Sequence, residues 1–538
     1  MATATTATPG ARALIPGAPV MAVPAEHVAP KRLFAFLIMV FGMFMSILDI
    51  QIVSASLAEI QAGLSASASE VSWVQTAYLI AEVIAIPLSG FLSRALGTRM
   101  LFAISAAGFT FASLMCGFTS SIEQMILWRA IQGFLGAGMI PTVFASAYTV
   151  FPRSKFHIVG PIIGLVATLA PTVGPTVGGY ITDLMSWHWL FFINVVPGIG
   201  ITIGVLALVD FDEPHLELLN HFDWWGLGFM AGFLGSLEYV LEEGPRNDWF
   251  SDASIFIFAI VCAVSAVLFF WRVLTAREPI VDIRAFTNRN FALGCMFSFC
   301  VGIGLYGLTY LYPRYLAEVR GYSALMIGET MFISGVAMFC SAPLVGRLMQ
   351  KVDMRLLIAF GLILFATGTW QMTWMTRDYD FYELLWPQIF RGVGMMMAMV
   401  PVNNIALGTL PPQRVKNASG LFNLTRNLGG ALGLALLNTA LDARTDFHIS
   451  RLHDKVTWAN AKAVETLNLF TQKFQGLGDA PTMAMKQLNQ IVHRQAVVMS
   501  FGDSFFMLTF FYLGLATLVV LLAKPANPMA APGGGGGH

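Results

Sequence analysis

Six charged side chains lie within long apolar stretches of this sequence, where a charged group is most able to do chemistry. They are Asp49, Glu82, Arg129, Glu329, Arg391 and Arg426. A charge in membrane hydrocarbon costs about 2.5–3.5 kcal/mol on insertion scales, so one that persists usually faces a cavity or a partner. Because burial favours the protonated form of a carboxyl group, such an acid can exchange a proton near neutral pH. We predict proton-coupling roles for the residues Asp49, Glu82, Arg129 and Glu329.

The predicted proton-coupling residues each have an alternative role. A static ion pair between Arg129 and either Asp49 or Glu82 would lock helices together and carry no proton. Arg129 is expected to be a structural cation that also tunes a neighbouring carboxylate. Glu329 ranks third because its helix is expected to begin near Leu325, which leaves the carboxylate close to water. An acid in the second half of the chain would nevertheless suit recognition of a cation.

The elements that must position these residues are membrane helices. The 538 residues are 56% hydrophobic and 12% charged, with a mean hydropathy of +0.68. A helix needs about 20 mostly apolar residues to span a bilayer, because its backbone must satisfy its own hydrogen bonds there. The sequence therefore predicts an all-α polytopic membrane protein with fourteen spans. They cover residues 33–56, 71–93, 100–118, 124–150, 157–182, 189–209, 226–243, 253–274, 290–312, 325–350, 355–376, 383–407, 416–441 and 501–523.

The composition argues against several other classes of protein. Lys plus Arg and Asp plus Glu both number 31, so no positive surplus favours a nucleic-acid partner. The five cysteines show no metal-ligand spacing, and none of the nine histidines lies in the middle of a span. No nucleophile or phosphate-loop motif occurs. We therefore predict no metal, no cofactor and no enzymatic activity, and no ATP-driven pump.

The distribution of Lys and Arg predicts the orientation of the chain. They concentrate in every second short connection, as at Arg94 and Arg347, and such connections remain cytoplasmic. An even number of spans then places both termini in the cytoplasm and the long connection 442–500 outside. Residues 1–32 are expected to be a disordered tail without a signal peptide. Residues 524–538 are expected to be a Gly-rich tail.

Two sequence patterns recur in the two halves of the chain. Pro87-Leu88-Ser89-Gly90-Phe91-Leu92 recurs as Pro343-Leu344-Val345-Gly346-Arg347-Leu348, and the Arg-led, Gly-rich stretch 129–141 recurs as 391–401. Because secondary transporters are built from repeated bundles around a central site, the repeat predicts two six-helix bundles. These are residues 33–209 and 290–523. The segment 210–289 matches neither half and is predicted to be an insertion of two helices with their linkers.

Five segments carry the motifs of a known family, in the order and positions typical of it. They are Leu48-Asp49-Ile50-Gln51-Ile52-Val53, Arg129-Ala130-Ile131-Gln132-Gly133, Gly174-Pro175-Thr176-Val177-Gly178-Gly179, Trp187-His188-Trp189-Leu190-Phe191-Phe192-Ile193-Asn194 and Ser419-Gly420-Leu421-Phe422-Asn423-Leu424-Thr425-Arg426-Asn427. From about residue 33 to 523, the chain resembles the major facilitator superfamily. Within it, the resemblance is to the fourteen-helix drug:proton antiporters of the EmrB/QacA type.

This resemblance implies a location in the bacterial inner membrane, surrounded by lipid. EmrB-like members work with a periplasmic adaptor and an outer-membrane channel, so the resemblance implies these partners as well. The family's cytoplasmic loop motif corresponds to Gly90, Arg94, Gly97 and Arg99. The family normally has an acidic residue where Arg94 stands, and this chain departs from the pattern there.

The fifth-span motif, with Gly174, Pro175, Gly178 and Gly179, corresponds to the family's antiporter motif. Proline removes a backbone donor and glycine allows close helix contact, which together favour a kinked and tightly packed span. Such a span could serve as a hinge, or it could form a permanent packing groove.

Two features outside the motifs have less obvious roles. Glu238 and Glu242 lie one turn apart on the same face of an inserted span, and that position argues against a central role in transport. The stretch 458–474 has apolar spacing compatible with a short amphipathic helix, within the long connection 442–500. This helix could cover the outer mouth of the protein or dock an adaptor.

Together these features predict a proton-coupled multidrug efflux antiporter. It would export hydrophobic or amphipathic small molecules across the inner membrane by alternating access of its two bundles, in exchange for protons. The alternative is a dedicated exporter of one metabolite, such as a siderophore or a lipid-like molecule. A receptor would differ from both because it would bind ligand without a proton-dependent flux. The sequence singles out no substrate-binding residues.

Overall fold

The computed structural model describes residues 29–276, 279–476 and 478–523, which form helices and no strand. A helix covers each of the fourteen predicted spans, which confirms the predicted all-α polytopic fold class. Twelve helical segments are long and apolar enough to cross a membrane by length and composition. The predicted tails 1–32 and 524–538 lie outside the described residues, apart from residues 29–32.

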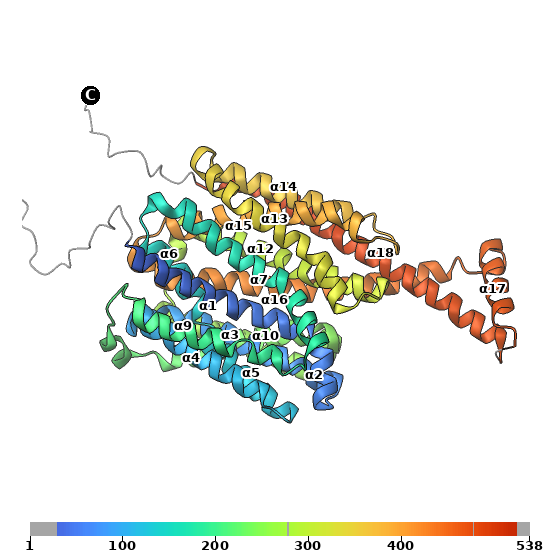
Figure 1. Cartoon of the computed structure of the whole chain (residues 1–538), viewed down its shortest axis with the longest axis horizontal. Helices are drawn as coiled ribbons and strands as arrows, with labels where there is room; N and C mark the ends of the chain where they lie inside the picture. Colours follow the sequence, from blue (N-terminus) through green and yellow to red (C-terminus); the bar gives the residue numbers. More distant parts are fainter. Residues whose placement is uncertain (1–28, 277–278, 477, 524–538) are drawn as a thin grey trace, which may run out of the picture.

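The first half of the chain forms a bundle of six membrane segments (Figure 1). Its helices are α1 (Pro30–Ala55), α3 (Ala68–Ala95), α4 (Gly97–Gly117), α5 (Ile122–Gly136) continued by α6 (Met139–Val150), α7 (Phe156–Leu184), and α8 (Trp189–Phe192) followed by α9 (Val195–Leu208). A short helix, α2 (Leu57–Leu64), connects α1 to α3. Ser67 and Glu70 form a capping box at the start of α3, which satisfies its first backbone donors.

The second half forms the other bundle, beside the first. Its helices are α12 (Arg289–Tyr315), α13 (Ala324–Lys351), α14 (Met354–Met372), α15 (Phe381–Gly408), α16 (Pro412–His453) and α18 (Ala480–Leu518). The start of α1 and the end of α18 lie at the same end of the molecule, which we call the termini end (Figure 1). The opposite end, which we call the arm end, carries a projecting arm.

The arm is built from the connection that the sequence marks as a loop at 442–500. Instead of a loop, α16 continues to His453 and α18 begins at Ala480, so most of this connection is helical. The amphipathic helix predicted within 458–474 is present as α17 (Ala461–Lys473) at the tip of the arm (Figure 1). At 1.5 Å per residue, residues 480–500 of α18 alone span about 30 Å. The arm therefore reaches well beyond the bundle.

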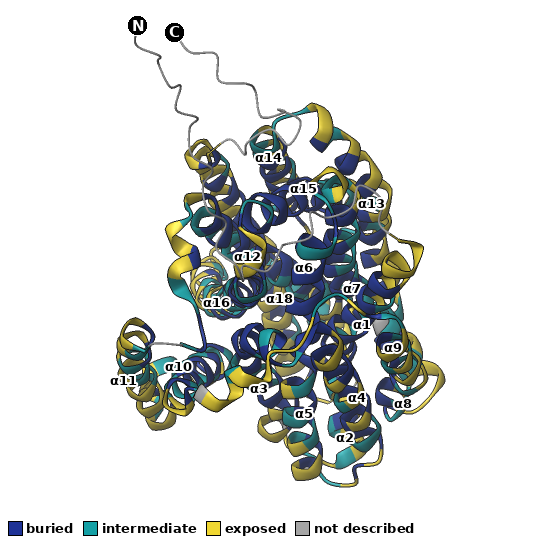
Figure 2. Cartoon of the chain, turned by 90° about the vertical axis from the view of Figure 1, so that its left-hand side faces the viewer, coloured by how far each residue is buried: buried dark blue, intermediate teal, exposed yellow. Residues whose placement is uncertain are grey.

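The inserted helices α10 (Trp224–Glu243) and α11 (Ala253–Thr275) lie at the side of the molecule (Figure 2). Asp223 caps α10 through the backbone N–H of Gly226, and it also forms an ion pair with Arg272 of α11 at 2.9 Å. This contact fixes the start of one inserted helix to the end of the other. α11 exposes a continuous apolar surface, as expected for a helix in contact with lipid. Its exposed apolar residues include Phe256, Ile257, Ile260, Val264, Val267 and Trp271.

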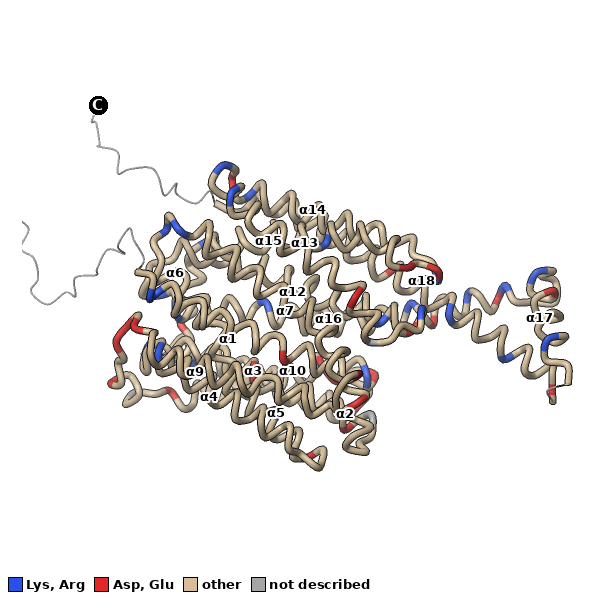
Figure 3. Tube along the Cα trace, in the orientation of Figure 1, with Lys and Arg blue, Asp and Glu red and all other residues tan. Residues whose placement is uncertain are grey.

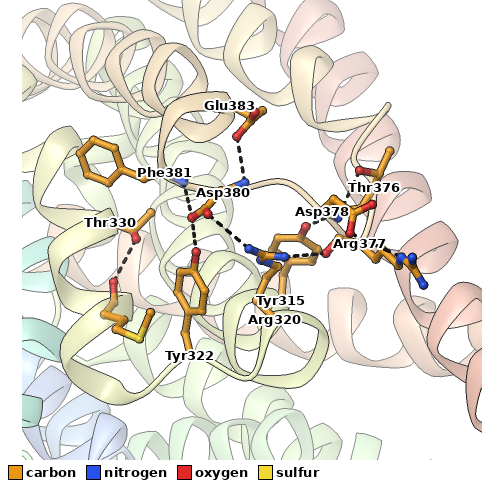
Figure 4. A network of polar contacts seen from close by, with 11 residues as sticks. Tyr315, Arg320, Tyr322, Thr330, Thr376, Arg377, Asp378, Asp380, Phe381 and Glu383 are labelled. Atoms are coloured by element: carbon orange, nitrogen blue, oxygen red, sulfur yellow. Dashed lines mark hydrogen bonds and ion pairs between the residues drawn. The ribbon is translucent and has the colours of Figure 1, made fainter.

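Charged residues gather at the two ends of the bundle and along the arm, with few in its interior (Figure 3). At the arm end, a polar network joins the connections α12–α13 and α14–α15 (Figure 4). Asp380 caps α15 and accepts a hydrogen bond from the hydroxyl of Tyr322, and Arg320 forms an ion pair with it at 3.3 Å. The hydrogen bond from Tyr322 holds the pKa of Asp380 below its ordinary value. The network fastens the arm end of the second bundle.

Candidate functional site

A cavity of about 640 Å³ lies between the two bundles. Its wall is formed mainly by α1, α3, α10, α12 and α16, with Pro175 of α7 and Ile327 of α13. The lining extends from Glu82, near the middle of α3, to Arg246 and Asp442 at the arm end. The cavity is therefore open toward the arm end. A volume of this size suits a drug-sized compound.

The lining of the cavity has an excess of acidic side chains. It contains five carboxylates, Glu82, Glu238, Glu242, Glu318 and Asp442, against the two guanidinium groups of Arg246 and Arg314. Glu318 is paired with Arg314 at 2.7 Å. Within the described part of the chain, Glu82, Glu238 and Glu242 form no ion pair within 4.0 Å.

Glu82 is a buried acid with one carboxylate oxygen that lacks a partner in the described part of the chain. Only 2% of the residue is exposed, and its Oε1 has no hydrogen-bond partner among the described residues. A buried and unpaired carboxylate strongly prefers to bind a proton or a cation, because isolated charge is costly away from water. Its position in the cavity wall gives such a ligand a route to it. The structure thus favours Glu82 among the predicted proton-coupling residues.

Asp49 differs from Glu82, because each oxygen of its carboxylate has a hydrogen-bonding or ion-pair partner. Arg129 of α5 forms an ion pair with Asp49 of α1 at 2.7 Å, and both side chains are completely buried. The amides of Asn194 and Gln132 donate to the other carboxylate oxygen at 2.7 and 3.2 Å. Arg129 also stacks on the ring of Tyr78, 4.2 Å from its centre. This arrangement contains the ion pair with Arg129 that the sequence left open as an alternative for Asp49.

The glycines of the fifth-span motif pack α7 closely against α1 within the same bundle. A Cβ atom added at Gly174 would lie 2.3 Å from the Cβ of Gln51, and one at Gly178 would lie 3.0 Å from the carbonyl oxygen of Ile52. α7 remains a single helix from Phe156 to Leu184 despite three internal prolines, Pro161, Pro171 and Pro175. This geometry favours the packing-groove interpretation of the motif over the hinge.

We expect Gly174→Leu to lower the stability of the folded protein rather than to arrest transport selectively. Overpacking a tight contact costs about 1–3 kcal/mol, because the two backbones must move apart. The melting temperature of the purified protein should fall, and transport should fall only as the folded fraction does. Gly200→Leu is the matched control, since nothing lies within 4 Å of a Cβ at that position. A normal melting temperature with arrested transport would support a hinge instead.

The termini end of the interface between the bundles is closed by polar contacts. Asp212, in the connection between α9 and α10, accepts hydrogen bonds from the backbone N–H and the hydroxyl of Thr98, at 2.9 and 3.0 Å. Asp212 also forms an ion pair with Lys416, at the start of α16. Lys416 donates to the carbonyl of Ser93 at 3.1 Å. We call these four residues the termini-end latch.

Most of the predicted loop motif lies at this closed contact. A Cβ at Gly90 would lie 2.9 Å from the Cα of Asn417, so α3 and α16 nearly touch there. Gly97 adopts a left-handed φ of 78°, which lets the chain turn between α3 and α4 beside the latch. Arg94 stacks on Phe91, 5.7 Å from the ring centre. Arg99 is exposed and lies outside the contact.

We expect Asp212→Asn to loosen the termini end, because the amide cannot form the ion pair with Lys416. A charged hydrogen-bonded contact of this partial burial contributes about 1–2 kcal/mol, so opening should become roughly tenfold more favourable. Distances between spin labels at Arg99→Cys and Arg414→Cys, in a background without other cysteines, would measure how far the two bundles separate at the termini end. Asp210→Asn, which removes an exposed acid two residues away, is the control. An unchanged distance distribution would show that the latch does not hold this end closed.

Comparisons with known proteins place the chain in a family. A profile of the Major Facilitator Superfamily matches residues 39–434. The chain belongs to that superfamily. The colistin resistance protein EmrB of Acinetobacter baumannii is 42% identical over 492 residues, which cover 91% of this chain and 96% of that protein. The multidrug export protein EmrB of Escherichia coli is 33% identical over 499 residues, with coverage of 92% and 95%.

A solved structure has the same fold. The human organic anion transporter MFSD10 aligns with a TM-score of 0.56 and 12% identity, covering 90% of this chain and 100% of that one. The predicted resemblance to EmrB-type members of the superfamily is thus confirmed.

The structure separates the predicted site residues of this superfamily member into three places. Asp49 and Arg129 form the buried pair, Glu82 faces the cavity, and Glu329 does neither. Glu329 is exposed one turn into α13 and does not line the cavity. Its carboxylate is exposed near the start of the helix, which was its alternative position. It therefore has no structural support as a proton-coupling residue.

Several residues of the site escaped the sequence analysis. Gln132 and Asn194 lie inside quoted motifs, and their polarity within apolar spans was a usable signal. Asp212 lies in an ordinary polar connection, and nothing in the sequence points to its contact with Lys416. Glu238 and Glu242 line the cavity, although their position in the inserted span argued against a central role in transport.

Proposed function

We propose that this chain is a proton-coupled multidrug efflux antiporter that exports hydrophobic or amphipathic compounds by alternating access. One observation carries the proposal: the unpaired buried carboxylate of Glu82 faces a drug-sized cavity that is open at one end and closed at the other. Two of its relatives are a multidrug export protein and a colistin resistance protein, which supports export of drugs. We infer a transporter rather than an enzyme.

In the proposed cycle, a proton and the exported compound compete for the cavity. A proton that enters from the arm end neutralises Glu82 and releases the compound on that side. The charged groups that act on the Glu82 carboxylate are Arg129 of α5, Arg426 of α16 and Asp49 of α1. The termini-end latch must then open so that the proton leaves on the opposite side and a new compound enters. Rocking of two bundles around one site is the usual form of such a cycle.

The proposed location is the bacterial inner membrane, with both termini in the cytoplasm. Lys and Arg near the helix ends at the termini end, such as Arg347 in the last turns of α13 and Arg414 in the first turn of α16, support this orientation. The arm and the open end of the cavity then face the periplasm. The observed state would therefore be open outward.

Drug accumulation in an efflux-deficient bacterium tests the proposed function. Cells that express the protein should accumulate less of a hydrophobic dye than cells with an empty vector. An uncoupler should abolish the difference, because it removes the proton gradient. Export that persists with the uncoupler present, or no difference in accumulation at equal membrane abundance, would contradict the proposal.

We further propose that the arm docks a periplasmic adaptor, which would connect the protein to an outer-membrane channel. Trp458 is 78% exposed and Leu469 is 59% exposed, and together they line a shallow hollow at the tip. Large apolar side chains so far beyond the bundle are well placed to contact a protein. The same surface is too distant from the cavity to form part of its wall.

We expect the double variant Trp458→Ser/Leu469→Ser to lower drug resistance in cells while leaving drug binding by the purified protein unchanged. Loss of two apolar anchors should weaken adaptor docking by about 10-fold or more. Lys473→Ser, on the same helix, is the control for a general effect of changing α17. Unchanged resistance at equal abundance would exclude docking through this surface, and lost binding by the purified variant would assign the arm to the fold or the site.

A further inference from the structure

Arg391 of α15 is a buried cation that the proposed transport cycle does not use. It begins the stretch 391–401, which repeats the stretch 129–141 of the first bundle, and only 2% of the residue is exposed. In the first bundle, Asp49 neutralises the buried Arg129 at 2.7 Å. Within the described residues, Arg391 has no carboxylate within 4.0 Å. The two repeats therefore differ in how the charge of their buried arginine is balanced.

The helices around Arg391 offer it no acidic side chain. α15 packs mainly against α12, α13 and α14 of its own bundle and against α7 of the other. α12 and α14 contain no Asp or Glu, and the acids of α13 and α7, Glu329 and Asp183, are exposed. Glu383, the acid of α15 itself, is exposed and accepts the backbone N–H of Asp380 at 3.0 Å. Because a buried charge is costly without a counter-charge, the second bundle needs one that these helices do not supply.

Other buried polar side chains surround the guanidinium of Arg391. Its Nη2 donates to the hydroxyl of Ser334 of α13 at 3.1 Å. Its central carbon lies 5.3 Å from the centre of the ring of Tyr312 of α12. Gln388, one turn before Arg391, donates to the sulfur of Met331, one turn before Ser334, at 3.3 Å. Gln388 and Arg391 therefore share the face of α15 that meets α13, and we call Tyr312, Ser334, Gln388 and Arg391 the Arg391 cluster.

Three members of the Arg391 cluster each have a buried polar atom without a hydrogen-bond partner among the described residues. These atoms are Nη1 of Arg391, the hydroxyl of Tyr312 and Oε1 of Gln388. Because buried polar groups are nearly always hydrogen-bonded, three such atoms in one cluster indicate a ligand. The guanidinium and the phenol are donors, and rotation of the terminal torsion of Gln388 presents its NH2 group instead of its oxygen. A cation with neutral donors beside it is a set of groups that binds anions.

We propose that the Arg391 cluster binds a small monovalent inorganic anion, such as chloride, as the counter-charge of Arg391. The ion accepts hydrogen bonds from Nη1 of Arg391 and from the hydroxyl of Tyr312, while Ser334 holds Nη2. One negative charge balances one guanidinium, whereas the second charge of a divalent anion would stay unpaired. The unbranched side chain of Met331 is flexible enough to adjust around the ion. The ion links α12 to α15, and this role does not depend on the proposed export function.

The melting temperature of the purified full-length protein in phosphatidylcholine nanodiscs tests this site. Sodium chloride replaces sodium gluconate at constant ionic strength. We expect the melting temperature of the wild-type protein to rise with chloride to a plateau, by at least about 2 °C, because a ligand of the folded state stabilises it. Arg391→Gln should lose this rise, since it removes the charge that attracts the ion. Arg377→Gln, which removes an exposed arginine between α14 and α15, is the control and should keep it.

Tyr312→Phe decides the question if Arg391→Gln does not fold. Phenylalanine keeps the aromatic ring and removes the hydroxyl, which has no hydrogen-bond partner among the described residues. The chloride concentration for half of the rise should increase about fivefold or more, because the ion loses one donor. An unchanged concentration in this variant would count against the site.

Bromide locates the ion directly, because it resembles chloride and gives an anomalous diffraction signal. Crystals of the wild-type protein grown in saturating bromide should show an anomalous peak beside Nη1 of Arg391. A water molecule at that place, without an anomalous peak, would overturn the proposal. So would a melting temperature of the wild-type protein that does not respond to chloride. A rise of the same size in Arg391→Gln would assign the effect of chloride to another part of the protein and would also overturn it.

Discussion

Glu82→Gln is expected to abolish transport driven by a pH gradient while leaving the protein folded, with weaker binding of its substrate because the neutral amide imitates the protonated form that releases the compound. Glutamine has the shape of a protonated glutamate but cannot release a proton, so the cavity should stay in its protonated form. Because Oε1 of Glu82 has no hydrogen-bond partner among the described residues, the substitution breaks no hydrogen bond at that atom. Flux of a hydrophobic dye into proteoliposomes along an imposed pH gradient should fall to the level of liposomes without protein.

A second assay with the same variant separates loss of coupling from loss of transport. Exchange of labelled for unlabelled dye needs no net proton movement, so Glu82→Gln should retain it at a saturating dye concentration, where weaker binding does not limit the exchange. Glu59→Gln, an exposed acid on α2, is the matched control and should behave as wild type in both assays. Normal gradient-driven flux by Glu82→Gln would remove Glu82 from the coupling mechanism. Loss of both activities would give it a role in binding or folding instead.

Hydropathy and local motifs predicted the architecture well because both depend on residues that are close together in the sequence. Apolar runs long enough to cross a bilayer must be helical, so each predicted span contains a helix. The buried acids Asp49 and Glu82 were found because a charge inside such a run is rare and needs a reason to persist. Their different environments, one paired and one unpaired, depend on tertiary packing that the sequence does not display.

The errors came from features that hydropathy does not measure. A polar segment outside the membrane can continue a membrane helix, and α16 runs on to His453 through residues that hydropathy marks as a loop. The role of α10 depends on its docking in the seam between the bundles, which brings Glu238 into the cavity wall. Asp212 was missed because its partner Lys416 is about 200 residues further along the chain. Contacts of this kind require the fold.

The buried pair of Asp49 and Arg129 leads to a second prediction with a large effect. We expect Asp49→Asn to destabilise the first bundle, because the guanidinium of Arg129 would remain buried without its counter-charge. Removing one partner of a buried ion pair costs about 3–5 kcal/mol. The melting temperature and the membrane abundance of the variant should both fall clearly. Loss of transport should follow from loss of the folded protein.

The double variant Asp49→Asn/Arg129→Gln distinguishes a structural pair from a proton carrier. With both charges removed, no buried charge is left alone, so stability should recover relative to the single variant. Melting temperatures of the wild-type protein, both single variants and the double variant would measure the coupling between the two side chains. If Asn at position 49 instead leaves the melting temperature unchanged and removes only gradient-driven flux, Asp49 carries the proton. The pair would then have to open during transport, because the carboxylate can accept a proton only after it leaves Arg129.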